Sequence, residues 1–185
     1  MRGIVFTAFL TFLDGQKHEG IVNRILDELE PELKNSAFTS VNHYPSKDLK
    51  TMLAAASRAM NEPVADMVRD FGTFLFRHLM SKLGMHVEEY DTWQAMLTNV
   101  EVAIHESVQK LEPERKIPVF LTPVEDANSA LSLHYKSPRG MADLAEGLIL
   151  GCLQHYGVDQ NIAVCRIDLA DDGTSSIFKM NQREI

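Results

Sequence analysis

The chain has 185 residues, and 18 Lys and Arg against 26 Asp and Glu give it a formal net charge of −8. This length suits one domain, or two small lobes on a shared core, and it can bury roughly 70% of the unfolded surface without disulfide support. The acidic balance argues against nucleic acid and anionic membranes as partners, and two cysteines, Cys152 and Cys165, are too few for a disulfide framework and favour a reducing compartment.

The N-terminal segment Gly3 to Leu13 is mostly apolar and follows the basic residue Arg2, so it resembles the apolar region of a signal sequence. It contains two threonines, runs into charged residues and lacks a small-residue cleavage site, which favours a buried first helix of the mature protein. No apolar run reaches the roughly 20 residues that span a bilayer. We therefore expect a soluble, cytoplasmic protein.

Helical periodicity dominates the first two thirds of the chain. It predicts helices over residues 19–30, 46–60, 64–83 and 92–111. Ser46 and Thr92 are expected N-caps, while Pro31 and Pro63 break the pattern. The positions expected to face inward on the helix over 64–83 are Val64, Met67, Val68, Phe71, Leu75 and Leu79.

After Pro113 the pattern changes to short β-rich runs. Strands are predicted over residues 119–122, 130–135, 162–169 and 175–180, with a helix over 141–156. The last two strands form a hairpin across Asp171-Asp172-Gly173. The fold class is therefore α+β in one domain over 1–185: a helical lobe, about 1–62, precedes a lobe, about 63–185, that has helices and a four-stranded antiparallel sheet.

Several catalytic motifs are missing. There is no Gly-rich phosphate loop, no G-x-S-x-G and no C-x-x-C, and His105-Glu106 is not followed by a second histidine at position 109, which is Gln. A hydrolytic or nucleotide-dependent enzyme is therefore not expected.

Two features suggest a ligand. If the strand stays extended beyond Tyr135, then Tyr135, Ser137 and Arg139 project to one side, and their hydrogen-bond donors can hold carboxylates or a phosphate. A polar strand end paired with nearby acids is the alternative. His105 lies near the apolar face of its helix, where it could ligate a metal from one side or simply bond to backbone.

Haem accounts for both features at once, because its iron takes one axial imidazole and its two propionates take donors. The large apolar macrocycle also needs a hydrophobic slot, for which the many Met, Phe and Leu side chains are available. Composition alone would not select this ligand.

The whole chain resembles the haem–nitric oxide/oxygen binding (H-NOX) family, the bacterial relatives of the haem domain of soluble guanylate cyclase. The matching stretches are Met1-Arg2-Gly3-Ile4, Tyr44-Pro45, Phe71-Gly72, His105-x-x-Val108-x-Lys110-Leu111-x-Pro113, Pro118, Tyr135-x-Ser137-x-Arg139 and Leu144-Ala145-Glu146-Gly147-Leu148. The resemblance implies haem b (iron protoporphyrin IX) between the two lobes.

The resemblance also implies roles for individual residues. His105 would be the proximal iron ligand, and Pro118 would press on the haem and keep it non-planar. Tyr135, Ser137 and Arg139 would hold the propionates. The residues that would line the distal side or pack on the porphyrin are Val5, Phe9, Leu75, Leu144 and Leu148.

Position 144 bears on gas selectivity. Oxygen-binding members of the family carry a tyrosine at the matching position, whose hydroxyl stabilises O2 by a hydrogen bond of about 0.5–1.5 kcal/mol. Leu144 has no donor. We therefore expect a five-coordinate ferrous haem that binds NO and CO but excludes O2.

Some relatives hold a structural zinc through Cys and His, and this chain departs from that pattern. Met141 stands where the first Cys is expected, and Ser175 and Ser176 occupy a later ligand stretch, although Cys165 matches one position. We predict no zinc, and we expect Cys152 and Cys165 to be buried apolar groups.

The family resemblance implies a sensor that is not an enzyme. NO would weaken the bond between iron and His105, free its helix and let the haem relax against Pro118, which biases two packings of the lobes. A separate effector would read the change: a sensor histidine kinase, or a cyclic-di-GMP enzyme (diguanylate cyclase or phosphodiesterase). The alternatives are an O2-binding or haem-carrier protein and an acidic interaction module without haem, whereas a peroxidase lacks its distal acid–base pair.

Overall fold

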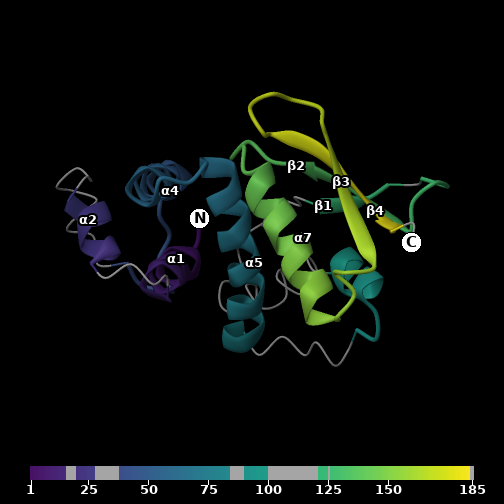
Figure 1. The fold of residues 1–185 in the computed structure, drawn as a ribbon, viewed down its shortest axis with the longest axis horizontal. Helices are drawn as coiled ribbons and strands as arrows, with labels where there is room; N and C mark the ends of the chain where they lie inside the picture. Colours follow the sequence, from purple (N-terminus) through teal and green to yellow (C-terminus); the bar gives the residue numbers. More distant parts are fainter. Residues whose placement is uncertain (16–19, 28–37, 84–89, 100–120, 125, 184–185) are drawn as a thin grey trace.

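A computed structural model of the chain describes residues 1–15, 20–27, 38–83, 90–99, 121–124 and 126–183. Helices occupy most of the first half, and Figure 1 shows them on one side of the molecule, with the strands on the other. The labelled helices are α1 (Gly3–Gly15), α2 (Ile21–Asp27), α4 (Ser46–Met60), α5 (Val64–Leu83) and α7 (Ala142–His155). Residues 93–99 are also helical, and the Thr92 side chain caps them by accepting the Ala95 N–H at 3.2 Å, as predicted.

The predicted bounds of α4 are confirmed, and its predicted N-cap is corrected by one residue. Pro45, not Ser46, occupies the N-cap position, and no side-chain hydrogen bond caps the helix. The Pro45 carbonyl accepts the Asp48 N–H at 3.2 Å, so Ser46 is already the first helical residue. The helix ends where predicted, because Asn61 adopts a left-handed conformation (φ 54°) directly before Glu62-Pro63.

One inward position of α5 is also corrected. Val64 is 45% exposed, whereas Met67, Phe71 and Leu75 are almost fully buried. Val64 is the first residue of the helix, where no preceding turn shields it.

The four strands are β1 (Leu121–Pro123), β2 (Leu131–Lys136), β3 (Ile162–Asp168) and β4 (Ser175–Gln182). They form one antiparallel sheet in the order β1-β2-β4-β3, which confirms the predicted fold class. β3 and β4 are consecutive and pair as the predicted hairpin, and Gly173 in their turn has φ +69°. Because strand side chains alternate, Leu133, Tyr135 and Phe178 share the buried face of the sheet.

Buried side chains form two hydrophobic clusters that meet along α5 and α7, which lie side by side in Figure 1. The first cluster joins α1, α2 and α4 to α5, and the second joins α7 to the sheet and to the helical residues 93–99. Leu148 of α7 packs against both clusters. A boundary between lobes near residue 62 stays a prediction, since α5 contributes to both clusters.

Among the helices of the described residues, none combines the length and the hydropathy needed to cross a lipid bilayer.

Candidate functional site

Tyr135 is held at the end of β2 by its neighbours on the chain. Its side chain is 5% exposed and lies in the cluster between the sheet and α7. The phenol oxygen accepts a hydrogen bond of 3.2 Å from the Met141 N–H, directly before α7 begins. Since the oxygen accepts, its own O–H hydrogen is left to donate to a ligand.

Ser137 and Arg139 do not continue the strand as the extended pattern predicted. β2 ends at Lys136, and the Gly140 N–H donates to the Ser137 carbonyl at 3.2 Å, which closes a turn with Pro138-Arg139 at its centre. Gly140 has φ +56°, and a Cβ there would lie 2.4 Å from the Asp172 carbonyl oxygen. Proline favours such a turn because it presets its own φ and removes a ladder donor.

The turn places the Ser137 hydroxyl, like the Tyr135 phenol, where its oxygen accepts a hydrogen bond from a backbone N–H. Ser137 is 2% exposed, and its Oγ accepts the Arg139 N–H at 3.2 Å. Both hydroxyl oxygens therefore accept from the backbone, and both O–H groups remain available as donors. Together with the guanidinium of Arg139, this donor set suits carboxylates, which fits the two propionates of a haem.

Arg2, the residue directly before α1, carries a second donor group. The Nε and Nη1 atoms of Arg2 are buried, and neither has a hydrogen-bond partner among the described residues. A buried cationic group without an acceptor is costly, so an anionic ligand near this end of α1 would be stabilising.

The five residues expected on the distal side come from three helices and belong to one cluster. Phe9 of α1, Leu75 of α5 and Leu144 of α7 are 0%, 2% and 7% exposed. Val5 and Leu148 are partly buried and pack against the same cluster. Every one of these side chains is a hydrocarbon, so their surface offers no hydrogen-bond donor.

The other two predicted residues, His105 and Pro118, lie outside the described residues. The described ranges contain no group of three His, Cys, Asp or Glu side chains arranged to hold a metal ion. The absence of zinc stays a prediction.

Sequence reasoning missed the ion pairs that hold α7. Arg166 of β3 pairs with Asp143 in the first turn of α7, and its Nη1 lies 3.4 Å from a Glu146 carboxylate oxygen. On the other side, Arg69 Nε of α5 lies 3.1 Å from Glu146. The signal available in the sequence was the pair of acidic residues Asp143 and Glu146, three positions apart at the start of the predicted helix.

Burial opposes the charge of Arg166, but the hydrogen bonds that its guanidinium donates to the carboxylates of Asp143 and Asp168 outweigh this effect and raise the pKa of the guanidinium. Arg166 therefore stays charged at any physiological pH. It fixes the helix that carries Leu144 and Leu148 to the sheet that carries Tyr135.

One expectation about the thiols is wrong. Cys152 is buried in α7 as predicted, and burial raises its pKa to about 12. Cys165 is exposed, because it lies on the outer face of β3, away from α7.

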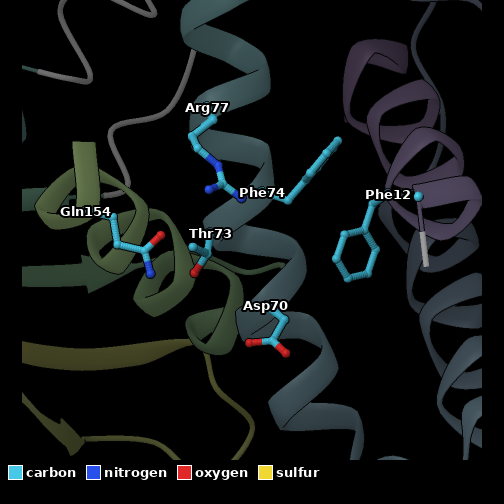
Figure 2. A pocket seen from close by; sticks show the side chains of 7 residues that line it. Phe12, Asp70, Thr73, Phe74, Arg77 and Gln154 are labelled. Carbon is cyan, nitrogen blue, oxygen red and sulfur yellow. The ribbon is translucent and has the colours of Figure 1, made fainter. Parts of the chain in front are cut away.

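A surface pocket of about 360 Å³ lies apart from the residues above, between the end of α1, α5 and α7. Figure 2 shows Phe12 facing it from α1 and Gln154 from α7, while Asp70, Thr73, Phe74 and Arg77 line it from α5. None of the predicted site residues lines this pocket, and its mixed polar walls do not suit a porphyrin.

Comparison with known proteins finds a family model and solved structures that match this chain. The model of the family described as Haem-NO-binding matches residues 2–164. The chain is similar to an H-NOX protein from S. oneidensis in the Fe(II)NO ligation state, with 26% identity, TM-score 0.83 and 100% of both chains covered. No curated protein matches the sequence.

Two further solved structures are similar over nearly the whole chain. The IWP-051-bound H-NOX from Shewanella woodyi in the Fe(II)CO ligation state shares 27% identity, with TM-score 0.78, over 99% of this chain and 95% of that chain. An Fe(II) unliganded H-NOX protein from K. algicida shares 24% identity, with TM-score 0.83, over 100% of this chain and 98% of that chain, and at this identity it supports the fold alone.

Proposed function

The chain belongs to the haem-NO-binding family, and from this premise we propose that it is a gas sensor that binds NO and CO at a five-coordinate ferrous haem b and excludes O2. The observation that carries the proposal is the apolar cluster formed by Val5, Phe9, Leu75, Leu144 and Leu148. The similar H-NOX structures in the Fe(II)NO and Fe(II)CO states support the choice of ligands.

When bound, the haem supplies a ferrous iron with one position open to a diatomic gas. In our proposal His105 ligates the iron and Pro118 presses on the ring. The hydroxyls of Tyr135 and Ser137 donate to the propionates, and Arg139 compensates their charge. The two hydroxyls are oriented in advance, because backbone N–H groups already hold their oxygens.

Selectivity would follow from the absence of a donor at the gas. O2 on ferrous iron gains from a hydrogen bond, whereas NO binds strongly without one. Leu144 is 7% exposed and sits in the first turn of α7 beside Met141, so water has little access to replace the missing donor.

The test is an absorption spectrum of the purified, reduced protein, recorded without oxygen, then with NO or CO, and then in air. We expect a shift of the main haem band with either gas and no gas-bound spectrum in air. A stable air-induced band in the reduced protein would overturn the proposed selectivity and favour an O2-binding protein.

A matched pair of variants isolates the hydroxyl. Leu144→Tyr adds a ring with a donor, and Leu144→Phe adds the ring alone. We expect O2 binding in the first variant and not in the second. If both bind O2, or neither does, the donor is not what decides selectivity.

The iron ligand is tested separately. His105→Gly should lose the five-coordinate ferrous spectrum and regain it when imidazole is added. An unchanged spectrum without imidazole would mean that another group ligates the iron. A protein that is colourless and does not take up added hemin would contradict the haem itself and leave an acidic interaction module.

We further propose that the protein has no catalytic activity and signals to a separate effector, a sensor histidine kinase or a diguanylate cyclase or phosphodiesterase. The ion pairs from Arg166 and Arg69 to Glu146 support the signalling role, because they join α7 to both the sheet and α5. A movement of α7 would therefore change contacts in both the sheet and α5. Affinity capture with and without NO that recovers neither class of enzyme would count against this part of the proposal.

A further inference from the structure

The two edge strands of the sheet, β1 and β3, differ in how well they are protected against pairing with a further strand. At one margin, β1 has three residues and ends with Pro123, which has no backbone N–H. At the other margin, β3 pairs with β4 over all seven of its residues, and its sequence contains no Pro and no Lys. Short length, Pro, Lys and bulges are usual protections of an edge. Among the described residues β3 has none of these, and its charged residues are Arg166 and Asp168, so β3 is the less protected edge.

The backbone groups that β3 turns away from β4 belong to alternate residues. At the end of the hairpin, the Leu169 N–H donates to the Ser175 carbonyl at 2.9 Å. At its open end, the Arg183 N–H donates to the Asn161 carbonyl at 2.8 Å. The backbone N–H and C=O groups of the odd-numbered residues of β3 therefore point toward β4. Those of the even-numbered residues, with Val164 near the centre, point outward from the sheet edge. In the described part of the chain, nothing pairs with that outward side of Val164.

We propose that β3 pairs antiparallel with β3 of a second copy, around a two-fold axis at Cys165. Cys165 is the middle residue of Ile162–Asp168, so an axis at this residue gives every residue of the strand a partner. Val164 of one copy then exchanges backbone hydrogen bonds with Arg166 of the other. The contact is isologous, as in most homodimers, and it extends the sheet of each copy into the other.

The side chains favour a second copy as the occupant because the outer face of β3 matches itself. This face carries Ala163, Cys165 and Ile167, and Ile167 is 42% exposed. The two-fold axis places Ala163 opposite Ile167 of the second copy and Cys165 opposite its own equivalent. On this face apolar groups therefore meet apolar groups across the new strand pair. On the opposite face Val164 lies across from Arg166 and Ile162 across from Asp168, so no like charges are opposed. Leu169, 54% exposed, extends the apolar strip just beyond the strand.

The same geometry makes Cys165 a reporter of the contact. Its backbone groups bond to β4, so the two Cys165 residues form a non-hydrogen-bonded pair, in which Cα atoms lie about 4.5 Å apart. A disulfide needs Cα atoms roughly 4.4–6.8 Å apart. The exposed thiols of a pre-formed dimer would therefore be within bonding reach.

The dimer itself is tested on the full-length reduced protein by sedimentation velocity over a range of concentrations. We expect reversible dimers that become more populated as salt is added, because two chains of charge −8 repel one another. Val164→Pro should weaken association at least tenfold, since it removes an outward N–H while an edge strand tolerates the proline. Val164→Thr is the matched control and should dimerise like the wild type.

The register is tested by oxidation with diamide, which takes up the two electrons and two protons released as the S–S bond forms. We expect a covalent dimer in the wild type and in Cys152→Ser, none in Cys165→Ser, and at least tenfold slower formation in Val164→Pro. Circular dichroism checks that Val164→Pro is folded. If it is not, Ile167→Glu is used as the disrupting variant and Ile167→Val as its control, in place of Val164→Pro and Val164→Thr.

Three results would overturn the proposal. The first is a reduced wild type that stays monomeric at all concentrations and salt levels. The second is equal rates of disulfide formation in Val164→Pro and the wild type, which would indicate random collisions of an exposed thiol. The third is a dimer that both edge variants leave intact, which would place the contact elsewhere.

Discussion

Replacing Gly147 by alanine should separate the two helices on which the candidate site is built. An added Cβ would lie 2.1 Å from the carbonyl oxygen of Arg69 and 2.8 Å from the Cα of Gly72. Ordinary contact begins at 3.4 Å, so α7 must recede from α5 by about 1.3 Å. Both obstacles are backbone atoms of a helix, which cannot rotate away.

The expected cost combines two opposing effects. Alanine favours a helix over glycine by about 0.5–1 kcal/mol, while overpacking a well-packed contact costs about 1–3 kcal/mol and occasionally more. We expect the second effect to prevail and Gly147→Ala to lower the free energy of unfolding by about 2 kcal/mol. Gly151→Ala meets the Phe76 Cβ at 2.7 Å and the Thr73 carbonyl at 2.8 Å and should cost less.

The assay is urea unfolding followed by circular dichroism, with the denaturant slope checked for constancy. The control is Gly15→Ala at the end of α1, where a Cβ meets no atom of the described residues within 4 Å. This control should stay within about 0.5 kcal/mol of the wild type. If Gly147→Ala is as stable as Gly15→Ala, then α5 and α7 are not in the close contact from which we reason.

Three more outcomes follow from the described side chains. Hydrogen bonds that Asp126 accepts from Lys179, from the Asn128 N–H and from Ser129 lower the pKa of its carboxyl to about 2. The stabilisation is therefore complete above about pH 4 and is lost as the pH falls toward 2. Asp126→Asn should therefore be less stable than the wild type in urea at pH 7, and the difference should shrink near pH 2. A thiol reagent at pH 8 should label Cys165 in the native protein and Cys152 only in denaturant, and fast labelling of both would mean that α7 opens readily. Arg139→Ala should release haem to apomyoglobin faster than Leu144→Phe does, and equal rates would remove Arg139 from the propionate site.

Local patterns in the sequence were enough for most of the secondary structure. Apolar spacing predicted α5 and α7 to within a residue or two, and the Asp171-Asp172-Gly173 turn predicted the β3–β4 hairpin. These features depend on contacts between residues close in the chain, and φ +69° at Gly173 is such a local requirement. The pair of hydroxyl donors, Tyr135 and Ser137, was also identified from one short segment, and its role at a haem stays a prediction.

Tertiary structure decided what depends on partners distant in the sequence. The turn at Pro138, where Gly140 lies against the Asp172 carbonyl, replaced the expected extension of β2. Cys165 proved exposed because its side chain lies on the face of the sheet that is turned away from α7. A strand pattern does not state which of its two faces a helix will cover. The pairing of Arg166 with Glu146 and the approach of Gly147 to α5 join residues on separate elements, so their energies arise only once the chain has folded around them.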